Sequence, residues 1–389
     1  IAYVSAYAGM AVVLKDLSRE AAQKGKERIA RIVEGRVSRG KLDRAAAEAL
    51  LDRIHPTADA GDLAGCDLVI EAVFENREVK AKVTRETEAV MDPNGVFASN
   101  TSTLPITSLA RASVRPERFI GLHFFSPVHK MKLVEIIVGA KTSDETIAKA
   151  FDYVQKIRKI PIVVNDNRGF FTSRVFGTYV EEGMTMLGEG YHPQGVESAG
   201  LQAGFPVGPL AVSDEVSLGL MDHIRRQTIE DFAAEGREYR RRCHEDVLDR
   251  MIELGRLGRA HGGGFYDYPE GGKRLWPGLL EHFPRRKDVD LPEMIDRILF
   301  VQAVETVRAM EENVLRSVAD ANIGSIFGWG FPPFHGGVLQ FIDAYGTRAF
   351  VARARELAHR YGPRFEPPSR LLAMAERDER FFAGPAPKR

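Results

Sequence analysis

The chain has 389 residues, which is enough for two or three domains and a substantial hydrophobic core. Its 54 lysine and arginine residues equal its 54 aspartate and glutamate residues, so the net charge gives no indication of nucleic-acid binding. No run of about 18 apolar residues is present, which excludes a membrane-spanning helix within this sequence.

The two cysteines are too few for a disulfide framework or a cysteine-rich metal site, and this usage suits a reducing compartment. The histidines and carboxylates also lack the spacing of common metal-binding motifs. We therefore expect a soluble, cytoplasmic protein without a metal site, an integral membrane segment or a nucleic-acid partner.

The opening stretch, IAYVSAYAGMAVVLKD, predicts the end of a helix followed by a short strand. Residues 1–7 have a helical pattern with no N-cap ahead of them, Gly9 ends the helix, and residues 12–14 form a buried apolar run that Asp16 follows. In a Rossmann unit, a carboxylate after the second strand binds the adenosine ribose and repels the extra phosphate of NADP, so Asp16 favours NAD. The alternative is a turn residue, which is the more common role of an aspartate after a strand.

A strand and a G-x-G-x-x-G turn are expected immediately before such a segment, because the turn places the pyrophosphate at the N-terminus of the next helix. The printed sequence contains neither of them. We therefore expect residues 1–7 to be the tail of this helix, with the first strand and the glycine turn missing from the sequence.

Short apolar runs then alternate with longer polar stretches of helical period. Residues 19–34 and 76–91 predict helices, and five apolar runs predict strands: CDLVIEAVF, GVFASNTS, RFIGLHFF, KLVEIIVG and IPIVVND. Nearly continuous valine and isoleucine runs separated by helices are typical of a mostly parallel sheet that is covered on both faces. The prediction for residues 1–167 is a doubly wound α/β domain of the Rossmann type.

The rest of the chain predicts helices, with one possible strand in GGFYDY. It contains a weak internal repeat, because SRVFGTYVEEGMTML ahead of GFPVGPL is echoed by DRILFVQAVETVRAM ahead of GFPPFHGG. Arg174 precedes Gly204 by 30 positions, and Arg297 precedes Gly330 by 33. We predict an all-helical C-terminal domain made of two copies of one unit. The predicted copies are residues 168–285 and residues 286–389.

Two polar residues stand inside the apolar runs of the predicted sheet. His123 lies at the end of RFIGLHFF, where open parallel sheets place reactive groups, and Glu135 lies in the middle of KLVEIIVG. A carboxylate in an apolar strand is costly to bury unless a hydrogen-bonding or positive group meets it. His123 is a suitable partner, because the carboxylate would accept from one ring nitrogen and leave the other free to take a proton from a substrate hydroxyl. The alternative is a solvent-facing glutamate on an edge strand and a structural histidine in the core.

Ser102 follows VFAS, again at the carboxyl end of a predicted strand. Its hydroxyl could hydrogen-bond a substrate oxygen, although a serine in such a place is more often an N-cap or a turn residue.

Several long stretches resemble the L-3-hydroxyacyl-CoA dehydrogenase family: SNTSTLPITSLA, RFIGLHFFSPVHKMKLVEII, RGFFTSRVFGTYVEEG, GFPVGPLAVSDEVSLGL and GGGFYDY. The duplicated end, GFPPFHGGVLQFID, resembles the alpha subunit of the bacterial fatty-acid oxidation complex, a multifunctional enzyme in which a hydratase/isomerase domain precedes the dehydrogenase. The resemblance covers nearly the whole chain. It implies oxidation of (3S)-3-hydroxyacyl-CoA to 3-oxoacyl-CoA by NAD in fatty-acid β-oxidation, and as partners a thiolase beta subunit and a second copy of the chain.

The same resemblance implies roles for individual residues. His123 would be the general base for the 3-hydroxyl, Glu135 the carboxylate that orients it, and Ser102 a contact of the reacting oxygen near the nicotinamide. Ser173 is a further catalytic candidate that stands where the family often has asparagine, and Gly263 replaces a family lysine. Contacts with the cofactor are implied for Asp16, Glu75, Lys80, Ser102 and Ser126.

The stretch EGRVSRGK lies where the family's early helical arm approaches CoA, and its cations Arg36, Arg39 and Lys41 are suited to phosphate oxygens. The alternative is a solvated charged face. Two other functions stay open for the whole chain. One is a relative that acts on another 3-hydroxy acid, such as 3-hydroxybutyryl-CoA or a sugar acid, and the other is a non-catalytic structural or scaffold protein, which the missing glycine turn would favour.

Overall fold

The structure is a computed structural model that describes residues 1–382 of the chain. Residues 383–389, which end the predicted second helical copy, lie outside the described residues. The chain forms two compact units. The α/β unit comprises residues 1–170 together with Val314–Arg316, and the helical unit comprises residues 171–313 with the chain from Ser317 onward.

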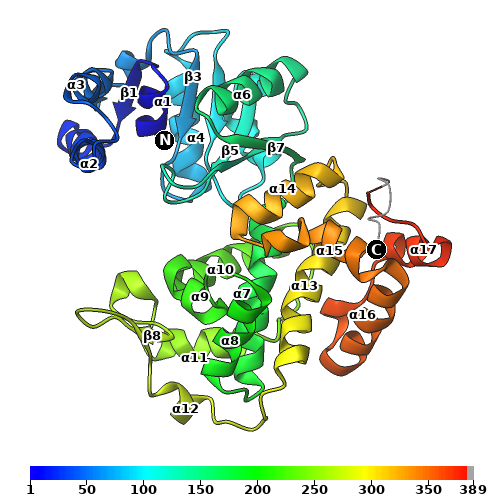
Figure 1. Ribbon diagram of the computed structural model, residues 1–389. Helices are drawn as coiled ribbons and strands as arrows, with labels where there is room; N and C mark the ends of the chain where they lie inside the picture. Colours follow the sequence, from blue (N-terminus) through cyan, green and yellow to red (C-terminus); the bar gives the residue numbers. More distant parts are fainter. Residues whose placement is uncertain (383–389) are drawn as a thin grey trace. The chain divides into compact units, whose positions relative to one another are not determined.

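The strands of the α/β unit form two sheets (Figure 1). All neighbouring strands are parallel except β5 and β6, which are antiparallel. The expected doubly wound α/β architecture of the Rossmann type is therefore confirmed. The smaller sheet pairs β1 (Val12–Lys15) with β2 (Ile54–Thr57), and the larger has the order β3 (Leu68–Glu71), β4 (Val96–Ser99), β5 (Phe119–Phe124), β6 (Leu133–Val138), β7 (Ile160–Asn165).

The sequence patterns do not predict β2, because its residues IHPT lack the continuous apolar run of the other strands. Ile54 is nevertheless fully buried, and β2 pairs with β1 along its whole length. Proline cannot donate to a ladder and is confined to edge strands or bulges. Among the described residues β1 is the strand that pairs with β2, so Pro56 lies at a sheet edge where it is tolerated.

Side-chain caps begin most of the longer helices of the α/β unit. Ser18, Asp43, Asn76 and Ser143 each accept a hydrogen bond from a backbone N–H in the first turn of the helix that follows. The helices are α1 (Ala2–Tyr7), α2 (Arg19–Val37), α3 (Arg44–Asp52), α4 (Arg77–Glu88), α5 (Ile106–Leu109) and α6 (Asp144–Lys156), with short 3-10 segments at Ala60–Leu63, Ala110–Ala112 and Pro116–Arg118.

The larger sheet is packed on both faces because successive side chains of a strand point to opposite sides. Ile120, Leu122 and Phe124 of β5 belong to a hydrophobic core to which α6 also contributes. Gly121 and His123 lie on the other face, and a Cβ at Gly121 would come within 2.9 Å of Ile106 of α5. His123 therefore lies on the face of the sheet that carries α5 and the loop before it.

The rest of the described chain is almost entirely helical, as predicted. Its helices are α7 (Thr172–Gly188), α8 (Pro193–Ala203), α9 (Pro209–Val216), α10 (Leu218–Ala234), α11 (Glu245–Glu253), α12 (Leu279–His282), α13 (Leu291–Glu311), α14 (Val318–Trp329), α15 (Val338–Tyr345), α16 (Thr347–Tyr361) and α17 (Ser369–Arg377). A short antiparallel hairpin joins β8 (Tyr266–Asp267) to β9 (Arg274–Leu275), and 3-10 segments lie at Arg259–His261, Pro333–His335 and Pro363–Phe365. No helix of residues 1–382 is long and apolar enough to cross a membrane.

The two GFP segments end equivalent helices. α8 ends at Gly204 and α14 ends at Gly330, and both glycines have the left-handed conformation, with φ of 103° and 77°. This conformation is strained for residues with a side chain, which explains glycine at both positions. The phenylalanines that follow, Phe205 and Phe331, are buried and pack edge to face with ring centroids 5.9 Å apart. The repeated sequence thus corresponds to two helix ends that meet in one core.

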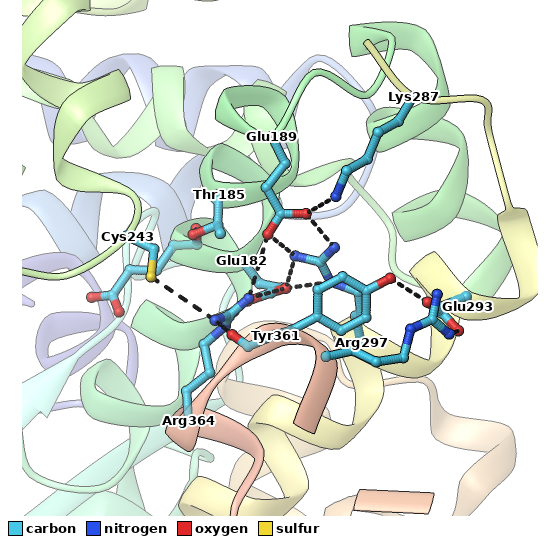
Figure 2. A network of polar contacts seen from close by, with 11 residues as sticks. Glu182, Thr185, Glu189, Cys243, Lys287, Glu293, Arg297, Tyr361 and Arg364 are labelled. Carbon is cyan, nitrogen blue, oxygen red and sulfur yellow. Dashed lines mark hydrogen bonds and ion pairs between the residues drawn. The ribbon is translucent and has the colours of Figure 1, made fainter. Parts of the chain in front are cut away.

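Helices α7 and α13 pack against each other in the helical unit (Figure 1) and bury an ionic network between them. Arg297 of α13 is fully buried, and it binds Glu182 through Nε at 2.6 Å and Glu189 through Nη1 at 2.8 Å. Figure 2 shows that Arg364 and Lys287 reach the same two carboxylates, while the ring of Tyr361 lies over the Arg297 guanidinium at 3.9 Å. Each buried charge in this group is therefore matched by an opposite one.

Candidate active site

His123 and Glu135 lie directly opposite each other on the antiparallel strands β5 and β6. The distance between His123 Nδ1 and Glu135 Oε2 is 3.0 Å, and the side chains are 8% and 0% exposed. Phe125 and Phe170 pack against the imidazole, with ring centroids 4.4 and 6.2 Å away. The structure therefore brings together the two residues that the sequence singles out, in a largely apolar surrounding.

The contact with Glu135 determines which ring nitrogen of His123 carries the proton. An ionised carboxylate can only accept, so Nδ1 of His123 must carry the proton that it shares with Glu135. Nε2 then holds the lone pair and is free to take a proton from a hydroxyl group. The interaction is strong because the contact excludes most of the water that would otherwise screen it.

Lys159 holds the turn that connects β5 to β6. Its ammonium donates to the backbone carbonyl oxygens of Val128 at 2.6 Å and Met131 at 2.5 Å, and both belong to the turn between β5 and β6. Burial lowers the pKa of Lys159. Sequence patterns do not reveal this role, because the lysine lies about thirty positions from its partners in the chain.

Ser102 lies in the loop after β4, half-buried between the buried Thr101 and Thr103. Asn100, at the start of this loop, accepts at its Oδ1 from the backbone N–H of Phe124 at 2.9 Å. This bond ties the loop to the end of β5, next to His123. The structure thus places the predicted serine and the predicted histidine on loops and strands that meet at one end of the sheet.

The end of the same loop is held by Asp166, which follows β7 directly. Its carboxylate accepts from the backbone N–H groups of Ile106 at 2.8 Å and Thr107 at 2.7 Å, in the first turn of α5. A carboxylate at this position also complements the positive end of a helix. Asp166 had no recognisable signal in the sequence, because its partners are some sixty residues away.

Apart from Ser102 after β4, the predicted cofactor contacts occupy three places at the carboxyl ends of the strands. The carboxylate of Asp16 is exposed at the end of β1, where its Oδ1 accepts from the N–H of Leu17 at 2.7 Å. Glu75 is partly exposed after β3, and Lys80 of α4 is buried against it with 3.2 Å between Nζ and Oε2. Ser126 is exposed after β5. Accessible carboxylates at these strand ends fit the ribose hydroxyls of a dinucleotide, which donate hydrogen bonds.

The three cations proposed for CoA do not share one environment. Arg36 of α2 is half-buried and donates from Nη1 to the hydroxyl of Tyr3 at 2.8 Å, while its guanidinium lies 4.7 Å from the ring centroid of Tyr7. Arg39 and Lys41 are exposed after the same helix. The latter two are therefore the better placed for phosphate oxygens.

Ser173 and Gly263, which the family resemblance singled out, lie in the helical unit. Ser173 is in the first turn of α7 and is half-buried. Gly263 lies beside Arg256, and a Cβ there would come within 2.9 Å of its Nη2. Arg256 donates to the carbonyl of Gly264 at 2.6 Å and to Asp267 at 2.7 Å. The guanidinium of Arg256 therefore lies beside Gly263, the position at which the family has a lysine.

Comparison with known proteins identifies the family. Residues 1–167 match the NAD-binding domain of 3-hydroxyacyl-CoA dehydrogenase, and residues 169–268 match the C-terminal domain of 3-hydroxyacyl-CoA dehydrogenase.

The solved structures that resemble the chain include three dehydrogenases. The 3-hydroxybutyryl-CoA dehydrogenase of Escherichia coli K12 is 25% identical with a TM-score of 0.81, over 97% of this chain and 95% of that chain. The (S)-3-hydroxybutyryl-CoA dehydrogenase PaaH1 of Ralstonia eutropha is 34% identical with a TM-score of 0.64, over 69% of this chain and 94% of that chain. The dehydrogenase part of multifunctional enzyme 1 from C. elegans shares the fold, at 23% identity and a TM-score of 0.66 over 96% and 85% of the two chains. The chain therefore belongs to the 3-hydroxyacyl-CoA dehydrogenase family and is an NAD-dependent dehydrogenase.

Proposed function

We propose that this chain oxidises (3S)-3-hydroxyacyl-CoA to 3-oxoacyl-CoA with NAD in fatty-acid β-oxidation, with His123 as the base and Glu135 as its support. The observation that carries the proposal is the 3.0 Å contact between His123 Nδ1 and Glu135 Oε2, with the glutamate side chain fully buried. Two relatives are named 3-hydroxybutyryl-CoA dehydrogenases, so a four-carbon acyl group belongs to the substrates proposed here.

The chemistry requires a proton and a hydride to leave the same alcohol. Nε2 of His123 takes the proton of the 3-hydroxyl as the carbon–oxygen double bond forms, and Glu135 stabilises the imidazolium that results. NAD, when bound, supplies the acceptor for the hydride that leaves C3. Ser102 donates a hydrogen bond to the reacting oxygen, and Ser173 is proposed as a further catalytic residue. Much of the acceleration comes from holding these groups in place.

The test is the reduction of acetoacetyl-CoA by NADH. Loss of a positioned general acid or base typically costs roughly 10²–10⁴-fold, so His123→Gln is expected to lose that much activity and Glu135→Gln to be strongly impaired. His359→Gln, which removes an exposed histidine of α16, is the matched control and should retain full turnover. Undiminished turnover in both active-site variants would remove the proposed mechanism.

We also propose that the chain is the dehydrogenase half of a multifunctional subunit, of the type found in the bacterial fatty-acid oxidation complex, and has two helical copies, residues 168–285 and 286–389. The equivalent helix ends at Gly204 and Gly330 support the duplication. The Escherichia coli relative aligns with 97% of this chain and so spans both copies, whereas the Ralstonia relative aligns with 69%. Light scattering should show a homodimer for the chain alone and a larger complex when a thiolase beta subunit is added. A monomer would contradict the first partner, and two unassociated proteins would contradict the second.

A further inference from the structure

A buried chain of polar contacts joins the ends of β3 and β4. Glu71, the last residue of β3, binds the Lys80 ammonium through both carboxylate oxygens at 3.0 and 3.1 Å. The same ammonium lies 3.2 Å from Oε2 of Glu75. The side chains of Lys80 and Glu71 are 2% and 3% exposed, whereas that of Glu75 is 18% exposed.

Lys80 needs both of these anions. It is the fourth residue of α4, close to the positive end of the helix, where a cation is disfavoured. Its ammonium is also removed from water, and a buried charge persists only when it is paired and hydrogen-bonded. Because its charge is used inside the protein, Lys80 serves as a bridge between the two glutamates.

The far end of this chain of contacts reaches the loop that carries Ser102. Oε1 of Glu75 accepts hydrogen bonds from the hydroxyl groups of Thr101 and Thr103, the residues on either side of Ser102. The Thr101 hydroxyl in turn accepts from the backbone N–H of Leu104 at 3.0 Å. Both threonines are buried. The backbone on each side of Ser102 is therefore held by the carboxylate that Lys80 holds.

Glu71 fixes the same loop from a second direction. One of its carboxylate oxygens accepts from the hydroxyl of Ser99, the residue opposite it at the end of β4. Its backbone carbonyl accepts from the N–H of Asn100 at 2.9 Å. The Glu71 side chain thus holds Ser99, directly before the loop, and through Lys80 and Glu75 the residues that flank Ser102, while its backbone holds Asn100.

We infer that Glu71 is a positioning residue for the reaction, acting through Lys80, Glu75 and the two threonines to set the place of Ser102. The inference rests on the proposed function, in which Ser102 contacts the reacting oxygen. Glu71 itself is 5% exposed and reaches the site through other residues. It is one of the residues that sequence reasoning missed, because a glutamate that ends an apolar strand has the same pattern as a solvent-exposed one.

A double-mutant cycle between Glu71 and Ser102 tests this inference, because the two act on the same step without the need for direct contact. Glu71→Gln keeps the size of the side chain but weakens its hold on Lys80, so kcat/KM for acetoacetyl-CoA should fall about tenfold, as expected for a displaced contact. In a Ser102→Ala background the same change should cost at most about twofold. Glu86→Gln on the exposed face of α4 is the control and should leave both values unchanged.

Thr101→Val provides a second cycle, because it removes the hydroxyl that Glu75 holds while keeping the shape of the side chain. Glu71→Gln should again add little to it, and circular dichroism should show all variants folded. Full additivity with Ser102→Ala, or a large effect of Glu71→Gln where Ser102→Ala has none, would overturn the inference. If Glu71→Gln does not fold, the remaining pair decides: Thr101→Val and Ser102→Ala must themselves be non-additive. Failure of the proposed function is separate, because it would appear as normal turnover in His123→Gln and Glu135→Gln.

Discussion

Arg174 of α7 and Arg297 of α13 each bind two glutamates of the other's helix, and the two sets of contacts match in their spacing along the sequence. Arg297 of α13 binds two glutamates of α7, Glu182 and Glu189, which follow Arg174 by eight and fifteen positions. Arg174 of α7 in turn binds two glutamates of α13 that follow Arg297 by the same intervals, through Nε at 2.5 Å and Nη1 at 2.5 Å. These partners are Glu305 and Glu312. Each guanidinium binds the nearer glutamate through Nε and the farther one through both Nη atoms, and Nη2 of Arg297 also lies 2.5 Å from Glu182.

The two arginines differ in burial, and their removal should differ accordingly. Arg297 is 0% exposed and faces Glu182, which is 1% exposed, so Arg297→Met leaves a buried carboxylate with one cation fewer and should destabilise the helical unit by about 3–5 kcal/mol. Arg174 is 17% exposed, its partners Glu305 and Glu312 are 16% and 48% exposed, and Glu305 keeps Arg308 at 3.1 Å, so Arg174→Met should cost only about 1 kcal/mol. Both tryptophans of the chain, Trp276 and Trp329, lie in this unit, so urea unfolding followed by their fluorescence is the measurement.

Arg377→Met is a suitable control, since this exposed arginine pairs with the neighbouring Glu379 and should have almost no effect. Equal losses for Arg174→Met and Arg297→Met would show that burial does not determine the strength of the two equivalent networks.

Acid should weaken the contact between α7 and α13. Burial raises the pKa of Glu305, but the charge and hydrogen bonds of Arg174 outweigh it, so the pKa of Glu305 lies below its usual 4.5. A carboxyl whose pKa is lowered by folding contributes stability above its unfolded value, and that contribution is lost as the pH falls below about 4.5. The pKa of Glu189 is likewise lowered, because Arg297 and Lys287 outweigh its burial. The unfolding free energy of the helical unit should therefore fall between about pH 5 and pH 3.

The slope of this pH dependence should be smaller in Arg174→Met, because the pKa of Glu305 then loses the cation that lowers it. Unfolding in urea at several pH values compares the two proteins directly. A variant that keeps the full slope would exclude Arg174 as its source.

Asp16 should determine the choice between the two nicotinamide cofactors. Its exposed carboxylate at the end of β1 would repel the additional phosphate of NADP, and Asp16→Ser would remove that repulsion. The ratio of kcat/KM for NADH to that for NADPH should fall at least about tenfold, as for the loss of one close charge interaction. Asp52→Asn, at the exposed end of α3, is a matched control. An unchanged ratio in Asp16→Ser would assign Asp16 to a turn without a role at the ribose.

Local sequence determined much of the fold. The apolar runs that become β4, β5, β6 and β7 are recognisable because a strand buried on both faces must be apolar along its length. Helix caps such as Ser18 and Asn76 are equally local, since the side chain binds an N–H two or three residues ahead. The sequence patterns did not predict β2, because its four residues include a proline and only one fully buried apolar side chain.

The sequence also pointed to His123 and Glu135, because each is costly inside an apolar strand unless it has a partner. It could not show that their strands are antiparallel neighbours, which is what places Nδ1 against Oε2. Nor could it show the contacts of Glu71, Asp166 or Lys159.

What the sequence alone determined is therefore most of the segments that form strands and helices, and that His123 and Glu135 need a partner. What the tertiary structure decided is which partner each one has. The Asp166 carboxylate meets a helix sixty residues earlier in the chain, and Arg297 meets a glutamate 115 residues earlier. Periodicity and capping follow from neighbouring residues, whereas such pairings follow from how whole elements pack, and the packing depends on every element at once.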